Sequence, residues 1–317
     1  MSQEIRFTYP SADRITDIQA MMWIPDGKIR GILQISHGML EFVERYGEFA
    51  RFLNRHGILT VGNDHLGHGG SVRSEAYYGY FAEKNGNKIL LSDMRELQRM
   101  TQEKYPDLPY FLLGHSMGSF LARQYLCQYG TYLDGAIICG TAWHSGLEAR
   151  AGMLLCRLIA RGKGWRYRSR LVNRLAIGSF NRKFHPARTP MDWLSRDEEA
   201  VDRYRSDPRT QFVFTVNAYE QMFAGLKYLS DSKNLARMPK DLPVLFAAGE
   251  EDPVGNFGRG VRRVERQFKA AGILQVSMKL YEGDRHEILN ELDREQVYED
   301  ILQWCEEIIS RPDHRGA

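Results

Sequence analysis

The sequence predicts an α/β fold, with a mostly parallel central sheet that is flanked by helices and carries a helical insertion. Short β-type runs alternate with segments of helical spacing near both ends of the chain, a pattern typical of parallel sheets with helical crossovers. The alternation stops in the middle, where no buried strand is indicated. We therefore expect one core formed by residues 1–144 and 240–317 and a helical cap, or lid, formed by residues 145–239.

In the first half of the chain, strands and helices alternate after two N-terminal strands. The second of these strands is joined to the next by a Pro25-Asp26-Gly27 turn. We expect strands at 4–9, 16–24, 30–36, 58–63, 109–113 and 133–139, and helices within 41–57, 90–105 and 119–129.

The alternation resumes after the expected insertion. We expect strands at 243–248 and 274–281, a helix over 258–271 between them, and a last helix after Asp293. In open α/β sheets, ligands bind beyond the carboxyl ends of the strands. A lid inserted at that edge would therefore lie over a binding site.

The composition is that of a globular protein. Of the 317 residues, 43% are hydrophobic and 26% charged, and the formal net charge is +3. A charge this small gives no indication of a nucleic-acid partner. No apolar run reaches the roughly 18 to 20 residues that a transmembrane span needs. Because residues 1–10 have neither a basic start nor an apolar stretch, we also expect no signal peptide.

The cysteines are scattered and form no recognisable disulfide or ligand spacing. Most of them lie among apolar residues, as buried free thiols do. Free thiols are typical of a reducing compartment, so we expect a cytoplasmic protein. The four cysteines are Cys127, Cys139, Cys156 and Cys305.

One strand-to-helix corner carries a serine between two glycines. The run Gly114-His115-Ser116-Met117-Gly118 follows an apolar strand pattern and precedes a helical one. This is the context of a nucleophile elbow, in which a strained turn exposes the serine hydroxyl. Glycines flank the serine because a Cβ two residues away on either side would clash with neighbouring chain. We therefore predict that Ser116 is a catalytic nucleophile.

A base and an acid are expected after the last two strands. A serine hydroxyl is a poor nucleophile unless a base activates it and an acid orients that base. The last expected strand is followed by His286, which we predict to be the base. The strand before it is followed by Glu250, Glu251 and Asp252. We choose Asp252 as the acid, because Pro253 would set up a turn that directs its carboxylate inward.

The loop after the third expected strand carries the run His37-Gly38-Met39. It could aim a backbone N–H at the same point as the N–H of Met117. Two such donors would form an oxyanion hole, each worth about 3 kcal/mol. We also expect Gly38 and His115 to border the substrate.

These motifs occur together with a loop rich in histidine and glycine. The set comprises His37–Met39, residues 63–69 (NDHLGHG) followed by Ser71, the elbow at 114–118, Asp252 in GEEDPVG and His286 in GDRHEILNE. In order and spacing it resembles the α/β-hydrolases, specifically the monoacylglycerol lipase and lysophospholipase-like branch that is also classed with serine aminopeptidases. The resemblance covers about residues 30–140 and 240–310. The segment 188–197 (RTPMDWLSRD) is similar to that of bacterial members.

The resemblance implies hydrolysis of a carboxylic ester through an acyl-Ser116 intermediate, without a cofactor. One departure from the family pattern is Phe42, where relatives commonly carry a histidine after the glutamate. An aspartate at the elbow would indicate an epoxide hydrolase or a dehalogenase, so Ser116 argues against both. The same triad would serve an amidase, an aminopeptidase or a thioesterase, and a non-catalytic ligand-binding protein is a more remote alternative.

Other histidines admit simpler interpretations. His65 and His68 are three residues apart beside Asp64 and superficially resemble metal ligands. The family resemblance implies a structural turn at this place, and we expect no metal site. We expect His37 and His115 to pack and to form hydrogen bonds rather than to act as bases.

The expected cap is strongly basic. Between Ala149 and Arg188 there is no Asp or Glu, but there are eleven Lys or Arg residues. A basic amphipathic helix can lie on an anionic lipid surface or can close a pocket with its apolar side. We predict an apolar acyl-binding pocket and a lipid ester as the substrate. The stripe that we expect to bind the acyl chain includes Met153, Leu154 and Leu158.

Overall fold

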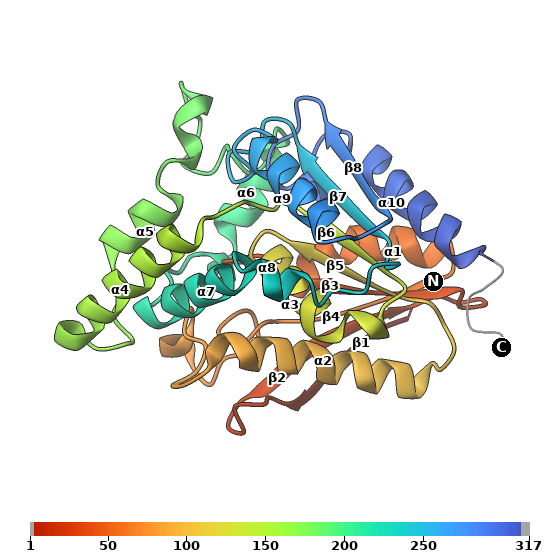
Figure 1. The fold of residues 1–317 in the computed structure, drawn as a ribbon, viewed down its shortest axis with the longest axis horizontal. Helices are drawn as coiled ribbons and strands as arrows, with labels where there is room; N and C mark the ends of the chain where they lie inside the picture. The colour runs from red at the N-terminus through yellow and green to blue at the C-terminus, as the bar shows by residue number, and fades with distance from the viewer. Residues whose placement is uncertain (1–2, 312–317) are drawn as a thin grey trace.

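A single eight-stranded sheet runs through the protein, with helices on both of its faces (Figure 1). The computed structural model describes residues 3–311. The strand order is β1-β2-β4-β3-β5-β6-β7-β8. β2 is antiparallel to both of its neighbours, and all later pairs are parallel. The strands are β1 (Gln3–Pro10), β2 (Asp17–Ile24), β3 (Gly31–Ser36), β4 (Ile58–Asn63), β5 (Tyr110–His115), β6 (Gly135–Cys139), β7 (Val244–Gly249) and β8 (Val276–Tyr281).

Two groups of helices bury the two faces of this sheet. α1 and α10 pack on one face, where Phe49 and Ile301 belong to one apolar cluster. α2, α3 and α9 cover the other face, with Leu97, Leu121 and Phe268 in a second cluster. The helices are α1 (Gly47–Arg55), α2 (Gly86–Lys104), α3 (Met117–Tyr129), α9 (Arg259–Ala270) and α10 (Arg294–Ile309).

Five helices follow one another between β6 and β7, with no strand among them. We call residues 146–235 the helical insert. It lies to one side of the sheet in Figure 1, and α4 packs along α7. The helices of the insert are α4 (Gly146–Lys163), α5 (Arg170–Ile177), α6 (Glu198–Ser206), α7 (Val216–Leu229) and α8 (Ser232–Leu235).

Short 3₁₀ helices complete the chain between these elements. They are η1 (Val43–Tyr46), η2 (Glu75–Tyr77), η3 (Gly130–Tyr132), η4 (Phe180–Phe184), η5 (Pro208–Thr210) and η6 (Ile288–Asn290).

The predicted fold class is confirmed. Most elements begin and end within two residues of expectation, and three of the differences have a local cause. The helix expected within 41–57 begins as the 3₁₀ turn η1 and becomes α-helical only at Gly47. α2 begins four residues early, at Gly86, directly after the left-handed Asn85 (φ 56°). β8 begins two residues late, because Leu274 donates its N–H to Lys240 outside the ladder.

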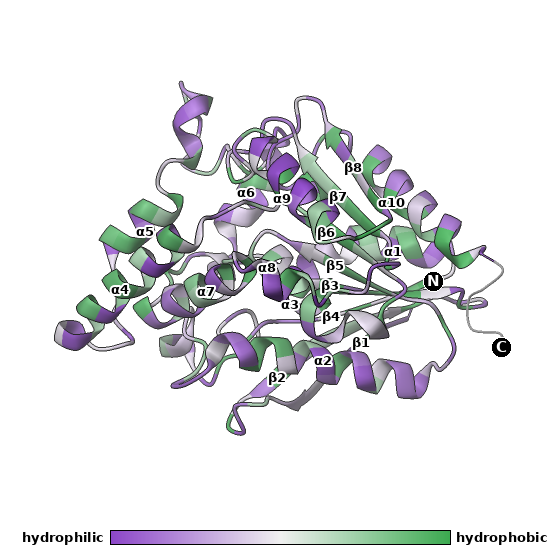
Figure 2. Ribbon diagram, in the orientation of Figure 1, coloured by the Kyte–Doolittle hydropathy of each residue, from purple (hydrophilic) through white to green (hydrophobic). Residues whose placement is uncertain are grey.

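The central strands carry the candidate loops to one edge of the sheet. Every residue of β3 to β7 is buried, which explains their apolar runs, visible in green in Figure 2. Because β3, β5, β7 and β8 run parallel, the loops that follow them meet at their common carboxyl edge. These loops hold the residues that the sequence singled out.

Candidate active site

Ser116 occupies the corner between β5 and α3, with no intervening loop. Its backbone has φ 53° and ψ −119°, a strained conformation for a residue with a Cβ. The flanking glycines are required by close approach. A Cβ at Gly118 would lie 1.9 Å from the carbonyl oxygen of Ser36, and one at Gly114 would lie 2.4 Å from that of Gly118. The corner therefore has the sterics of a nucleophile elbow.

The loops after β7 and β8 bring an acid to a histidine. His286 Nδ1 lies 3.0 Å from Asp252 Oδ1, and both side chains are buried. The other two acids of the β7 loop do not contact this histidine. Glu250 is exposed, and Glu251 pairs with Lys183 at 2.5 Å. Asp252 is thus the acid that the fold brings to His286.

Two neighbouring rings pack close to His286. Its ring centroid lies 4.8 Å from that of His115 and 5.1 Å from that of Trp193. Its backbone N–H donates to the carbonyl of Trp193 at 3.3 Å. Trp193 was not singled out by the sequence, although it lies within the family-like segment 188–197.

Ser116 and His286 both line a cavity of about 590 Å³ between the sheet edge and the helical insert. Met39, Met117 and His115 line it as well. The lining contains no Lys or Arg, and its acidic residues are Glu41, Glu148 and Glu287. The opposite side is mostly apolar and includes Leu155, Val172, Leu175, Phe180, Met222 and Phe223.

Four residues that we expected to border the substrate do not line this cavity: Gly38, Met153, Leu154 and Leu158. Leu154 and Leu158 are 58% and 53% exposed, and Met153 is buried in the protein. α4 instead turns Ala151, Gly152 and Leu155 toward the cavity. Leu154 and Leu158 face outward, because α4 packs with another face against α7.

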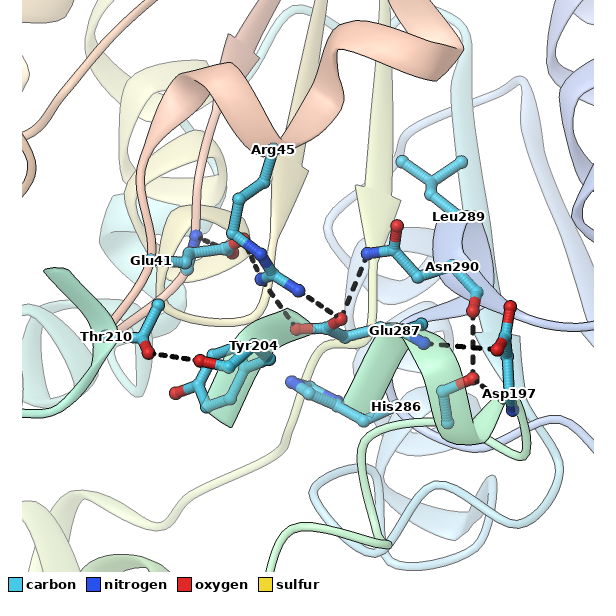
Figure 3. A network of polar contacts seen from close by, with 12 residues as sticks. Glu41, Arg45, Asp197, Tyr204, Thr210, His286, Glu287, Leu289 and Asn290 are labelled. Carbon is cyan, nitrogen blue, oxygen red and sulfur yellow. Dashed lines mark hydrogen bonds and ion pairs between the residues drawn. The ribbon is translucent and has the colours of Figure 1, made fainter. Parts of the chain in front are cut away.

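A buried ionic network adjoins the cavity and was missed by the sequence analysis (Figure 3). Glu41 and Glu287 share the guanidinium of Arg45. Burial disfavours the ionised form of Glu41, but His115 and Arg45 outweigh it and hold its pKa below the ordinary value. Burial likewise opposes protonation of His115, but Glu41 raises its pKa above the usual range. The network therefore stabilises the charged forms of Glu41 and His115, although both side chains are buried.

Comparisons with known proteins agree with this geometry. The sequence profile of the family described as "Serine aminopeptidase, S33" matches residues 27–293. The chain belongs to this family. It is 27% identical to a monoacylglycerol lipase of Mycolicibacterium smegmatis, covering 89% of this chain and 90% of that one. It is 25% identical to a monoglyceride lipase of Rattus norvegicus, covering 91% and 86%.

A solved structure supports the same placement. A thermostable carboxyl esterase from Bacillus coagulans, in complex with glycerol, is 29% identical with a TM-score of 0.90, covering 96% of this chain and 99% of that one. Among S33 family members, this chain thus falls in the monoacylglycerol lipase-like branch of the α/β-hydrolases.

The loops after β3 and β4 hold a cluster of buried histidines. The ring of His37 lies 4.3 Å from that of His65 and 5.2 Å from that of His68. His65 donates its backbone N–H to His37 Nε2 at 2.8 Å. Burial lowers the pKa of all three, that of His68 to about 3. These neutral rings pack and form hydrogen bonds, and the absence of a metal here stays a prediction.

Within residues 3–311, one group of acids is spaced as metal ligands are. Asp284, Glu291 and Asp293 each offer an oxygen within 4.8 Å of the others. Arg196, in the helical insert, pairs with all three carboxylates. The guanidinium therefore supplies the positive charge at this place, and the contacts connect the helical insert to the loop that carries His286.

Proposed function

We propose that the chain hydrolyses the carboxylic ester of a monoacylglycerol-like lipid through an acyl-serine intermediate. Its family and relatives make it a carboxylic ester hydrolase. The observation that carries the finer proposal is the meeting of Ser116, His286 and the apolar cavity at one sheet edge.

In this mechanism Ser116 attacks the ester carbonyl and His286 takes its proton. The carboxylate of Asp252 orients the ring and stabilises the imidazolium that forms. The backbone N–H groups of Met39 and Met117 stabilise the oxyanion. Met117 supports this role because it is the first residue of α3, so its N–H has no partner within the helix. His286 then protonates the leaving alcohol, and water releases the acid.

The chemistry of the cavity supports an apolar acyl chain and an uncharged alcohol part. Its insert side is lined by Leu155, Val172 and Phe223, which favour an aliphatic chain. A phosphate headgroup would have no Lys or Arg to pair with among the lining residues, and it would meet Glu148. The His115 ring in the lining is already paired with Glu41. Of the two expected lipid classes, a monoacylglycerol is therefore favoured over a lysophospholipid.

We infer that residues 145–239 act as a lid on a core formed by residues 1–144 and 240–317. The lid's outer face suits a lipid surface: exposed leucines on α4 and α5 stand among arginines (Figure 2). Leu175 is exposed and also lines the cavity, so the cavity opens beside this face. No helix in residues 3–311 is long and apolar enough to cross a membrane. The exposed leucines are Leu147, Leu154, Leu158, Leu171 and Leu175.

A cytoplasmic location stays a prediction from the sequence. The four cysteines, all free and buried, support it.

Flotation with anionic vesicles tests the proposed contact of the lid with a lipid surface. We expect binding that weakens as salt is raised, because the basic lid contributes to it. Binding insensitive to salt would contradict the electrostatic part.

The proposed reaction is tested by comparing esters with amides and thioesters of one decanoyl chain. We expect the glycerol monoester to have the highest kcat/KM, and we expect activity to rise with chain length from acetyl to decanoyl. An aminoacyl amide is included as a substrate for an aminopeptidase. Its hydrolysis at a higher kcat/KM than every ester would instead favour the aminopeptidase alternative.

A further inference from the structure

One arginine joins two of the loops that carry the proposed reaction. The guanidinium of Arg45 donates to Glu41 at 2.9 Å and to Glu287 at 2.8 and 2.7 Å. Glu41 lies in the loop after β3, and Glu287 follows His286 directly in the chain. Figure 3 shows the guanidinium between the two carboxylates. A single side chain thus links segments 242 residues apart.

The Glu41 end of this link holds the loop beside the nucleophile. Its Oε1 accepts the backbone N–H of Gly38 and lies 3.0 Å from His115 Nδ1. Gly38 in turn packs so closely that a Cβ on it would lie 3.0 Å from the Cβ of Ser116. Glu41 therefore fixes both the turn that carries the proposed oxyanion donor and the ring that precedes the nucleophile.

The Glu287 end holds the loop of the base. Its backbone N–H donates to the carbonyl of Leu194 at 2.7 Å, and Asn290 donates to its carboxylate at 3.0 Å. A second connection runs through His115, whose Nε2 lies 3.3 Å from the carbonyl oxygen of His286. The partners of both nitrogens of His115 are acceptors, so the ring donates twice and carries a positive charge. The two carboxylates are balanced by this ring and by Arg45.

We propose that Arg45 is a positioning residue that holds Ser116 and the proposed oxyanion donors in register with His286. The inference rests on the proposed function. The Arg45 side chain is 13% exposed and the two carboxylates are 4% and 5% exposed, so the ion pairs are little screened by solvent. A guanidinium can serve two carboxylates through separate N–H groups, whereas the ammonium of lysine is a compact point charge. A shift of about 1 Å in such a site costs on the order of 100-fold in rate.

The test is the steady-state kinetics of Arg45→Ala and Arg45→Lys on a chromogenic decanoyl ester. We expect kcat of Arg45→Ala to fall about 100-fold with KM within about threefold, and Arg45→Lys to recover only part of the loss. Arg45 also lines a separate surface cavity of about 350 Å³. Methylguanidinium added through this cavity should raise kcat of Arg45→Ala at least about tenfold, and methylammonium should not.

The matched control is Arg51→Ala on the neighbouring helix. Arg51 pairs with Glu4 at the surface, at 2.9 Å, so its removal should leave kcat within about twofold. Wild-type kcat in Arg45→Ala, or a rise in KM alone, would overturn the positioning role. A wild type without esterase activity would instead contradict the proposed function, so the two failures are distinguishable.

A neutral triple variant, Glu41→Gln with Arg45→Met and Glu287→Gln, covers the case in which Arg45→Ala does not fold. Removing all three charges together avoids leaving a buried carboxylate unpaired. His115 loses the Glu41 charge that raises its pKa, so its buried ring becomes neutral as well. We expect this variant to fold and still to show kcat about 100-fold below wild type, because the link between the loops is gone. Full activity in it would show that Arg45 acts only on stability and would overturn the proposal.

Discussion

The two walls of the cavity differ in origin and in chemistry. One wall comes from the loops at the carboxyl edge of the sheet and carries Ser116, His286 and the glutamates of the ionic network. The other comes from the helical insert and is mostly apolar, with Leu155 and Met222 as examples. The first is built on β3, β5 and β7, whose residues are all buried, and on the partly buried edge strand β8. The second is built on helices with exposed leucines.

The difference separates two tasks within one site. Strands fixed by burial on both faces place polar groups with little freedom, as acyl transfer requires. An insert between β6 and β7 can change its side chains without disturbing the sheet. We infer that the sheet-edge wall determines the chemistry and that the insert wall determines which acyl chain fits. Changes on the first wall should therefore lower the rate for all esters, and changes on the second should alter their order.

The largest effect is expected on the sheet-edge wall, from Asp252→Asn. The amide would favour the wrong state of the His286 ring, and kcat should fall on the order of 10⁴-fold for short and long esters alike. Glu250→Gln and Glu251→Gln serve as controls, because neither acid contacts His286. Their kcat should stay within about twofold of wild type. A larger loss of kcat in either control than in Asp252→Asn would show that Asp252 is not the acid that orients His286.

A smaller and selective effect is expected on the insert wall, from Leu155→Trp. The larger ring would fill part of the acyl space, so kcat/KM for a decanoyl ester should fall on the order of 10- to 100-fold, while an acetyl ester should be nearly unaffected. Leu158→Trp, three residues along the same helix, is the matched control, because Leu158 is exposed and does not line the cavity. Equal losses of kcat/KM for the decanoyl and acetyl esters would contradict the inferred division of roles between the two walls.

The smallest effect concerns the stability of the folded protein near the carboxyl edge of the sheet and its dependence on pH. Burial lowers the pKa of His68 to about 3, so the unfolded chain binds a proton below about pH 6.5 that the folded chain does not. This contribution to stability is complete above that pH and is lost as the pH falls toward 3.

His68→Phe removes this titration among the neighbouring rings of Phe81, Phe212 and Phe214. Relative to its own value at pH 7, the variant should lose about 2 kcal/mol less free energy of unfolding at pH 5 than wild type does. Chemical denaturation at the two pH values measures the difference. Parallel losses would show that His68 is not held neutral.

The sheet-edge wall was largely predictable from the sequence, and the reason is local. Each motif follows its own strand, so strand order alone brings Ser116 and His286 to one edge. The link from Arg45 to Glu287 was not predictable, because it joins residues 242 positions apart through side chains alone. On the insert wall, helical spacing indicated an apolar stripe on α4. Spacing does not tell which side of a helix faces a cavity, and Leu154 and Leu158 are exposed and do not line it.

The central claim is that Ser116 is a nucleophile activated by His286, which lies on the same sheet-edge wall. Labelling of the folded protein with a fluorophosphonate probe, with mass spectrometry to locate the adduct, tests it most directly. We predict one adduct, on Ser116, that is absent from Ser116→Ala and is slowed by a decanoyl monoglyceride. A folded wild-type protein that stays unlabelled, or an adduct on another residue, would contradict the account.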